Sequence, residues 1–187
     1  MSLTQLTTRA QEGVSAPEVQ VEIHISNGLP AFTMVGLPEA AVRESRDRVR
    51  SAIINSGFEF PVRRITINLA PADLPKEGGR YDLAIALGIL AASKQIDAST
   101  LDRFDCYGEL ALSGECRSVD GLLPALIASK QAQKQIIIPQ HNQAEAALVR
   151  EASIYSCNSL VEVCASLNGG EALPRVESSE ALTETIF

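Results

Sequence analysis

The sequence predicts a single ordered domain of the α/β (or α+β) class, with helices packed on a sheet. Strand-like segments come first along the chain, and helical segments then alternate with short strands. Apolar residues make up 45% of the 187 residues, which is enough for one good core. Aromatic residues are only 4% and there is no Trp, so this core has to be built from Ala, Leu, Ile and Val.

The first half of the chain predicts three strands and one helix. Residues 19–26 (VQVEIHIS) alternate apolar and polar residues, as a half-buried strand does. After the turn NGLP, residues 31–36 (AFTMVG) predict the return strand of a hairpin. Residues 37–57 predict a helix, with Pro38 in the first turn and Gly57 just beyond the end. Residues 63–71 (RRITINLAP) predict the next strand.

The predicted helix at 37–57 has two distinct faces. Its apolar stripe consists of Val42, Ser45, Val49, Ala52 and Ile53. Arg43, Arg46 and Arg50 recur at spacings of three and four on another face, where Glu39–Arg43 and Glu44–Arg48 form pairs four residues apart. The sequence therefore predicts a basic, solvent-facing stripe.

The second half predicts a central helix followed by alternating short elements. Residues 82–93 (DLAIALGILAAS) are apolar nearly all round, so they predict a buried helix with Asp82 as its N-cap. The remaining predictions are two short strand-like pieces within 105–119, helices at 121–133, 142–150 and 158–170, and strands at 135–139 and 152–157. Pro124 falls in the first turn of its helix, and Asn142 caps the next one.

The net charge of −7 does not indicate a general nucleic-acid binder, but the charge is unevenly distributed. Between Pro38 and Arg80 there are eight basic and six acidic residues. From Glu171 onward four glutamates face Arg175 alone. The first half is therefore mildly basic, and much of the acidity lies in the tail.

The cysteines and histidines do not predict a metal site. The four cysteines form no C-x-x-C pair, and His24 and His141 lie far apart in the sequence. We expect reduced, mostly buried thiols. The opening MSLTQLTTRA has no apolar signal-peptide core, and the apolar run at 83–92 is about half the length needed to cross a bilayer. A cytoplasmic protein without a membrane partner is expected.

The loop before the central helix, KEGGR, raises the question of a phosphate site. The nucleotide-binding loop G-x-x-x-x-G-K-[ST] needs a lysine after its glycines, whereas here Lys76 precedes Gly78 and Gly79. No Ser or Thr follows to hold Mg²⁺, and the pattern G-x-G-x-x-G is also absent. The simpler interpretation is a glycine turn that leads the chain into a buried helix.

Three long segments carry a family resemblance. They are GLPEAAVRESRDRVRSAIINSGFEFP, RRITINLAPADLPKEGGRYDLAIALGILAAS and GELALSGECRSVDGLLPALIAS. In this order they resemble the N-terminal domain of the ComM/YifB family of magnesium-chelatase-like AAA+ ATPases, over roughly residues 3–167. The pattern is also similar to the C-terminal domain of RadA/Sms and, more distantly, to the protease domain of Lon. The resemblance implies the ribosomal-S5-domain-2-like α/β fold.

The Lon resemblance gives the KEGGR loop a meaning. Lon-type proteases carry a serine nucleophile after a K-D-G-P-S loop and a lysine base in a G-G-L-K segment. The matching segments here are KEGGR and VDGLLP, so Arg80 stands at the serine position and Leu123 at the lysine position. A guanidinium cannot attack a carbonyl and a leucine cannot take up a proton, so the resemblance implies a degenerate site without catalytic residues.

The family resemblance implies a domain organisation and a role. Residues 1–168 correspond to the Lon-like domain, and residues 169–187 to a linker towards an AAA+ ATPase domain. This chain carries no Walker A motif, so no cofactor is expected in it, and ATP and Mg²⁺ belong to the longer protein. The implied longer protein is a hexameric DNA helicase or branch-migration motor of recombination and natural transformation. The domain would serve ring assembly or DNA contact, with Arg43, Arg46, Arg50, Arg63 and Arg64 as candidate contacts.

Other interpretations remain open from the sequence. The arginines of the basic stripe also suit a merely solvated face, balanced by neighbouring acids. Arg80 also suits a structural ion pair with Asp73 or Asp82. A residual Lon-type peptidase would need Ser113 or Ser118 near a lysine. A chelatase-type partner in metal insertion into tetrapyrroles is a further alternative, although no metal-ligand cluster supports that chemistry.

Overall fold

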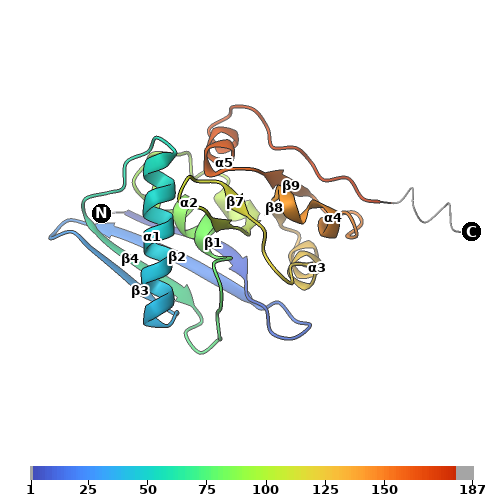
Figure 1. Ribbon diagram of the computed structural model, residues 1–187, viewed down its shortest axis with the longest axis horizontal. Coiled ribbons are helices and arrows are strands. Elements are labelled where there is room, and N and C mark those ends of the chain that lie inside the picture. Colours follow the sequence, from blue (N-terminus) through green and yellow to red (C-terminus); the bar gives the residue numbers. More distant parts are fainter. Residues whose placement is uncertain (1, 180–187) are drawn as a thin grey trace, which may run out of the picture.

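The computed structural model describes residues 2–179 and has a seven-stranded mixed sheet with helices packed against it (Figure 1). The strand order is β3-β4-β2-β1-β5-β8-β9, and a two-stranded sheet pairs β6 with β7. The strands are β1 (Ser2–Arg9), β2 (Glu18–Ser26), β3 (Ala31–Val35), β4 (Arg64–Ala70), β5 (Phe104–Cys106), β6 (Glu109–Leu110), β7 (Cys116–Arg117), β8 (Gln135–Pro139) and β9 (Ile154–Cys157). The helices are α1 (Glu39–Asn55), α2 (Asp82–Ala92), α3 (Leu123–Gln131), α4 (Gln143–Ala146) and α5 (Leu160–Leu167), with 3₁₀ turns η1 (Leu101–Arg103) and η2 (Gln140–Asn142).

The sheet is mostly parallel and confirms the predicted α/β class. Antiparallel pairing joins β4 to β2 and β2 to β1, whereas β3–β4, β1–β5, β5–β8 and β8–β9 are parallel. The β1–β5 junction rests on a single register pair, Thr7 opposite Asp105. This junction joins the long N-terminal strands to the short parallel strands of the C-terminal half.

The central helix lies where the sequence predicts it. All eleven residues of α2 are buried, and the helix packs against β1 and β2. The alternate residues of β2, from Val19 to Ile25, point into the same core. The packing is so close that a Cβ on Gly88 would lie 1.8 Å from the Cδ1 of Ile23. A glycine at this point of the helix therefore lets it sit directly on the sheet.

The predicted hairpin of residues 19–36 is wrong. β3 pairs in parallel with β4, and β4 lies between β3 and β2. The reason is that β4 offers a complete alternation, with Ile65, Ile67 and Leu69 buried, and pairs with β2 over seven residues. Strand β1 was not predicted, because its Thr-rich sequence alternates only weakly in polarity.

One predicted cap is wrong, and a second has the predicted position but no side-chain capping bond. Tyr81, not Asp82, occupies the N-cap position of α2, and the Asp82 side chain turns away to contact α1. Asn142 lies at the N-cap position of α4 but makes no capping bond with its side chain. The helix predicted at 142–150 is only four residues long, Gln143–Ala146. The Asp82 and Asn142 side chains instead bond distant groups, Arg48 and the Val119 backbone respectively.

The segment after α5 is partly packed onto the domain. The Val176 N–H donates to the Ile154 carbonyl at 2.8 Å, and the Ser156 N–H donates to the Pro174 carbonyl at 2.9 Å. Val176 is buried in the cluster formed by α3 and β8. The described residues 173–179 thus cover the outer edge of β9, although the sequence placed them outside the core. Residues 180–187 of the predicted linker lie outside the described residues, and the domain boundary at 168 stays a prediction.

Candidate functional site

The KEGGR loop joins β4 to α2, and Lys76 is a structural residue in it. The Lys76 Nζ donates to the carbonyls of Pro71 at 2.5 Å, Leu74 at 3.0 Å and Gly36 at 3.3 Å. The side chain is 4% exposed, and burial lowers the pKa of Lys76. All three ammonium protons have acceptors, so Lys76 holds the loop closed and has no proton free for a phosphate ligand.

Arg80, at the position of the Lon serine, is buried without a carboxylate partner among the described residues. Its guanidinium carbon lies 6.0 Å from the centre of the Tyr107 ring, and burial lowers the pKa of Arg80. Its Nε and Nη2 atoms are buried and have no hydrogen-bond partner. The suggested pair with Asp82 is wrong, because Arg48 occupies that carboxylate, and no pair with Asp73 is formed in the described part of the chain.

Asp82 is instead the centre of a buried polar cluster between α1 and α2. Arg48 donates to it through Nε at 2.6 Å and Nη2 at 3.2 Å, and Ser45 Oγ donates at 3.0 Å. The Leu110 N–H adds a bond at 3.2 Å. Burial raises the pKa of Asp82, and the Arg48 guanidinium acts in the opposite direction. The cluster fixes the start of α2 and therefore the position of Arg80.

Leu123, at the position of the Lon lysine, is the first residue of α3. Its N–H donates to Glu145 Oε1 at 2.6 Å, and its side chain is half-buried in the apolar cluster around α3. Asn142 bonds both backbone groups of Val119, at 2.8 and 2.9 Å. These two side chains of the η2–α4 segment hold the VDGLLP segment in place.

The structure brings the KEGGR and VDGLLP segments to one pocket of about 300 Å³. Its lining residues are Gln11, Glu77, Gly78, Gly79, Arg80, Glu109, Ser118, Val119 and Asp120. Ser118 lies in this pocket, whereas Leu123 is not among the lining residues and no lysine is. The two halves of the predicted degenerate site therefore meet as loops, but no serine–lysine pair lines the pocket that they form.

The five arginines predicted as candidate contacts divide into two groups. Arg43 lies 3.6 Å from Glu39, and Arg46 lies 3.5 Å from Asp47, so both arginines have acidic neighbours on α1. Arg50 instead has its guanidinium carbon 6.0 Å from the centre of the Phe60 ring. No ion pair is formed by Arg50, Arg63 or Arg64 within residues 2–179, and all three are exposed.

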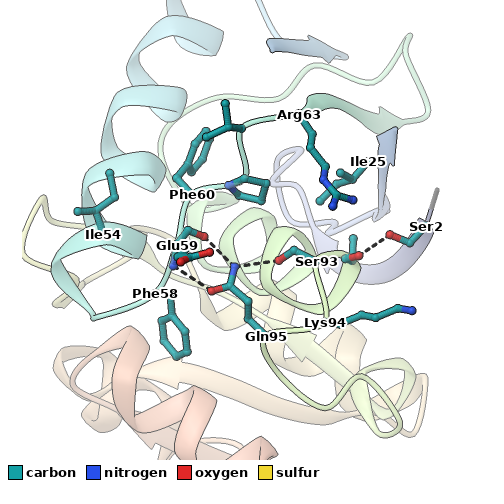
Figure 2. Close-up of a pocket in the computed structure, with 13 residues that line it drawn as sticks. Ser2, Ile25, Ile54, Phe58, Glu59, Phe60, Arg63, Ser93, Lys94 and Gln95 are labelled. Carbon is teal, nitrogen blue, oxygen red and sulfur yellow. Dashed lines mark hydrogen bonds between the residues drawn. The ribbon is translucent and has the colours of Figure 1, made fainter. Parts of the chain in front are cut away.

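A second pocket, of about 790 Å³, contains one of the predicted DNA-contact residues (Figure 2). Phe60, Arg63 and Lys94 line it, and the Gln95 side chain, bonded to both backbone groups of Glu59, forms part of its wall. Phe60 is also stacked on Phe32, with 6.3 Å between ring centres. Arg64, the first residue of β4, is not among the residues that line this pocket. Sequence reasoning missed both: Lys94 is 31 residues from Arg63 and only the fold brings it to the same pocket, and Phe60, three residues before Arg63, carries no motif that indicates a site.

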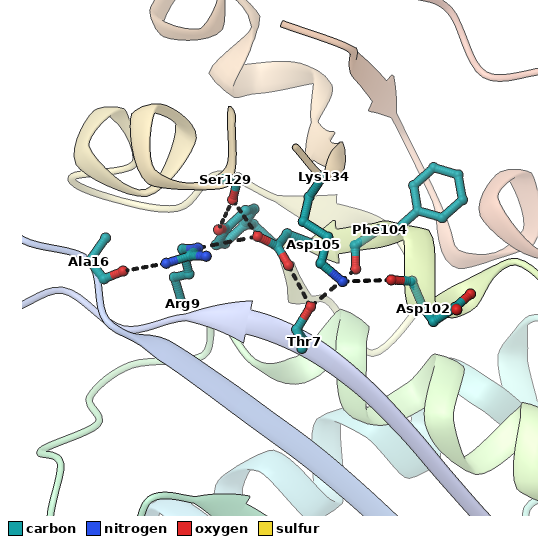
Figure 3. A network of polar contacts seen from close by, with 9 residues as sticks. Thr7, Arg9, Ala16, Asp102, Phe104, Asp105, Ser129 and Lys134 are labelled. Atoms are coloured by element: carbon teal, nitrogen blue, oxygen red, sulfur yellow. Dashed lines mark hydrogen bonds and ion pairs between the residues drawn. The ribbon is translucent and has the colours of Figure 1, made fainter. Parts of the chain in front are cut away.

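A buried network of polar side chains around Asp105 joins the two halves of the sheet, and the sequence did not predict it (Figure 3). Asp105 is fully buried and accepts hydrogen bonds from Thr7, from Arg9 Nε at 3.2 Å and from Ser129 Oγ at 2.6 Å. The Tyr107 hydroxyl lies 2.7 Å from Ser129 Oγ. Because these side-chain partners of Asp105 belong to β1 and α3, the network holds the β1–β5 junction together rather than forming an open site.

The thiols are free and buried, as predicted. Cys116 and Cys157 lie side by side, with their Sγ atoms 3.4 Å apart. Among residues 2–179, no group of three or more His, Cys, Asp or Glu is placed to hold a metal ion. In the same residues no helix is long and apolar enough to cross a membrane.

The buried α2 helix, the KEGGR loop before it and the packed VDGLLP segment define a Lon-like α/β domain. The chain is 27% identical over 137 residues to Lon protease 2 of Bacillus subtilis, covering 70% of this chain and 24% of that protein. The chain belongs to the family described as subunit ChlI of Mg-chelatase, whose model matches residues 21–142. The family recognised from the sequence is thereby confirmed.

Two relatives match over most of this chain. Competence protein ComM of Haemophilus influenzae is 53% identical over 174 residues, which cover 93% of this chain and 34% of ComM. The uncharacterized protein YifB of Escherichia coli is 50% identical over 186 residues, which cover 100% of this chain and 37% of YifB. The chain thus spans about a third of the length of these relatives.

Proposed function

We propose that this chain is a non-catalytic accessory domain of a longer ring-forming AAA+ ATPase that works on DNA. Membership of the chelatase-subunit family and similarity to a competence protein support an ATPase context. The longer protein, hexameric and cytoplasmic, would bind ATP and Mg²⁺ and drive helicase or branch-migration work in recombination and natural transformation. The domain would serve that ring by contacting DNA or a neighbouring subunit.

The observation that carries the DNA contact is the pocket around Phe60. It combines two exposed cations, Arg63 and Lys94, with an aromatic ring. Cations bind the phosphate backbone of nucleic acid, and aromatic faces stack on unpaired bases. Arg50, beside the same ring, extends the surface along α1. Arg43 and Arg46 contribute less in this proposal, because acidic neighbours offset their charge.

The net charge of −7 limits the affinity with which a single domain can bind DNA through this surface. A single acidic domain is repelled by a duplex at long range, so we expect the isolated chain to bind DNA weakly at physiological salt. A ring repeats the same surface around one axis, and the resulting effective concentration strengthens weak binding. DNA binding by this domain is therefore proposed as an avidity effect.

Changing Arg63 to Glu in the longer protein is expected to weaken DNA binding for every sequence tested, because the surface then has one cation fewer for the phosphate backbone. The slope of log affinity against log salt should decrease by roughly one for each phosphate that is no longer neutralised. The measurement is a salt titration of DNA binding in the presence of ATP. Arg117→Glu is the matched control, since Arg117 is exposed on β7 and the substitution changes the charge equally.

The outcomes of this titration separate the roles of the surface. If Arg63→Glu leaves the DNA affinity and its salt slope unchanged while the ring stays intact, Arg63 is only a solvated residue, and the proposed DNA contact is overturned. Disassembly of the ring in Arg63→Glu alone would assign the surface to assembly. Equal weakening by Arg117→Glu would indicate a general effect of charge and not a local interaction.

A second candidate is a partner role in metal insertion, which the description of the family as a Mg-chelatase subunit favours. Binding of a tetrapyrrole or of its metalating partner by the longer protein would support this role. We place it second because the competence relative is about one-half identical over nearly the whole chain.

A further inference from the structure

We propose that the pocket at Arg80 is a binding site for a peptide segment that carries a carboxylate next to a positively charged group. The proposal concerns the position that matches the Lon serine and not the Phe60 pocket. It therefore holds or fails independently of DNA binding.

The first step is the state of the Arg80 side chain. Only 6% of the residue is exposed, and its Nε and Nη2 atoms are sealed from solvent without an acceptor. Its Nη1 atom has no hydrogen bond among the described residues either, yet it is absent from the sealed group, so it remains accessible to solvent. Arg80 lines the 300 Å³ pocket, which is the opening available to that atom.

The second step is the kind of ligand that the buried Arg80 guanidinium requires. A buried guanidinium with unpaired N–H groups is costly unless an acceptor arrives, and its planar fork fits a carboxylate best. The Tyr107 ring covers one side of the group and offers no acceptor for the N–H bonds in the guanidinium plane. Since Nε and Nη2 are sealed, a ligand reaches the group through Nη1, and a carboxylate is the acceptor that a guanidinium binds best.

The third step is the rim of the pocket, which is acidic. Glu77, Glu109 and Asp120 line it together with Arg80. The Glu109 side chain lies against Gly79, where an added Cβ would come within 2.6 Å of it. Three carboxylates that line the same pocket as Arg80 repel a free anion, so a simple phosphate or acetate is disfavoured. A ligand that also brings a cation satisfies both the rim and Arg80.

The fourth step is the size of the pocket and the chemical class of its ligand. A volume of about 300 Å³ is at the lower limit of ligand pockets and has room for one or two side chains. The polypeptide is a ligand that offers a carboxylate and an ammonium on neighbouring residues. Since the Ser and Lys of a Lon-type site are replaced here by Arg80 and Leu123, such a peptide would be held without being cleaved.

The test uses the 187-residue chain and two short peptides followed by NMR of the Arg80 side-chain Nε–H. One peptide, acetyl-Ala-Lys-Ala with a free C-terminal carboxylate, represents a chain end. The other, acetyl-Ala-Lys-Asp-Ala-amide, represents an internal acidic side chain. We expect at least one peptide to shift the Arg80 signal in a saturable manner. The peptide that binds more tightly identifies the source of the carboxylate.

Three comparisons make the result decisive, with peptide affinities measured by isothermal titration calorimetry because the Arg80 variants lack the Arg80 NMR signal. Arg80→Gln should weaken binding by at least about tenfold, whereas Arg43→Gln, at an exposed arginine of α1, should leave it unchanged. Glu109→Gln should weaken binding of the lysine peptides, because the rim charge is reduced. Inorganic phosphate should bind more weakly than either peptide.

The proposal is overturned if neither peptide shifts the Arg80 signal, or if Arg80→Gln binds the peptides as well as the unchanged chain does. It is also overturned if phosphate binds as tightly as the peptides, since the acidic rim would then have no role. Because Arg80→Gln could itself unfold the chain, Arg80→Lys provides a second variant. It keeps the charge but lacks the fork, and its peptide affinity should lie between those of Arg80→Gln and the unchanged chain.

Discussion

Replacing Asp82 with alanine is expected to lower the free energy of unfolding by about 3–5 kcal/mol. The Asp82 carboxylate is fully buried and accepts four hydrogen bonds, two of them from the Arg48 guanidinium. Its removal leaves the Ser45 hydroxyl and the Leu110 N–H without an acceptor and Arg48 without its buried charge partner, with only the exposed Glu44 at 4.0 Å remaining among the described residues. The cost comes from these stranded groups more than from the net strength of the intact ion pair.

Urea unfolding of the Asp82→Ala chain, followed by circular dichroism, measures this change. Asp47→Ala is the matched control, since Asp47 is an exposed carboxylate on α1 and its removal should change stability by less than about 0.5 kcal/mol. A decrease below about 1 kcal/mol in Asp82→Ala would show that the cluster does not anchor the start of α2. A control that is destabilised as much as Asp82→Ala would lead to the same conclusion.

Truncating Leu87 to alanine is expected to cost about 2–5 kcal/mol. Leu87 is fully buried in the middle of α2, the helix that packs on β1 and β2. The cost combines the removal of buried methyl and methine groups with a cavity that the sheet on one side and α1 on the other cannot close. Leu90 and Ile85 belong to the same buried helix, so the neighbouring layers should remain in place around the cavity.

Denaturant unfolding should show a lower midpoint for Leu87→Ala with an unchanged slope, because the fold itself is retained. Leu112→Ala is a control of the same chemical change at a side chain that is 56% exposed. A difference of less than about 0.5 kcal/mol between Leu87→Ala and the unchanged chain would contradict the central position of α2.

The buried helix and the strands β2 and β4 could be predicted from the sequence because their patterns are local. The unbroken apolar run at 82–93 and the alternation of β2 and β4 leave few alternatives. The order of the strands could not be predicted in the same manner. Nothing in residues 19–36 shows that β4 will insert beside β2 and move β3 to the edge.

The candidate site was predictable in its positions but not in its environment. The motif resemblance identified Arg80 and Leu123, and the loops that carry them do form one pocket. The sequence did not show that Arg48 takes Asp82, or that Glu145 accepts from the Leu123 N–H. These partners are separated by tens of residues in the sequence. A polar side chain at a helix start can bond either the nearby backbone or a distant group, and the sequence does not show which one it bonds.

The most direct test of the central claim, binding without catalysis, is an activity measurement on the purified 187-residue chain. The chain is incubated with casein, with a fluorophosphonate that labels active serines, and with ATP. We predict no hydrolysis above a buffer blank and no labelling, because the pocket at Arg80 is lined by no lysine, and Lys76 is held by three carbonyls. Hydrolysis or labelling that disappears in Ser118→Ala, at the serine in the same pocket, would contradict the account.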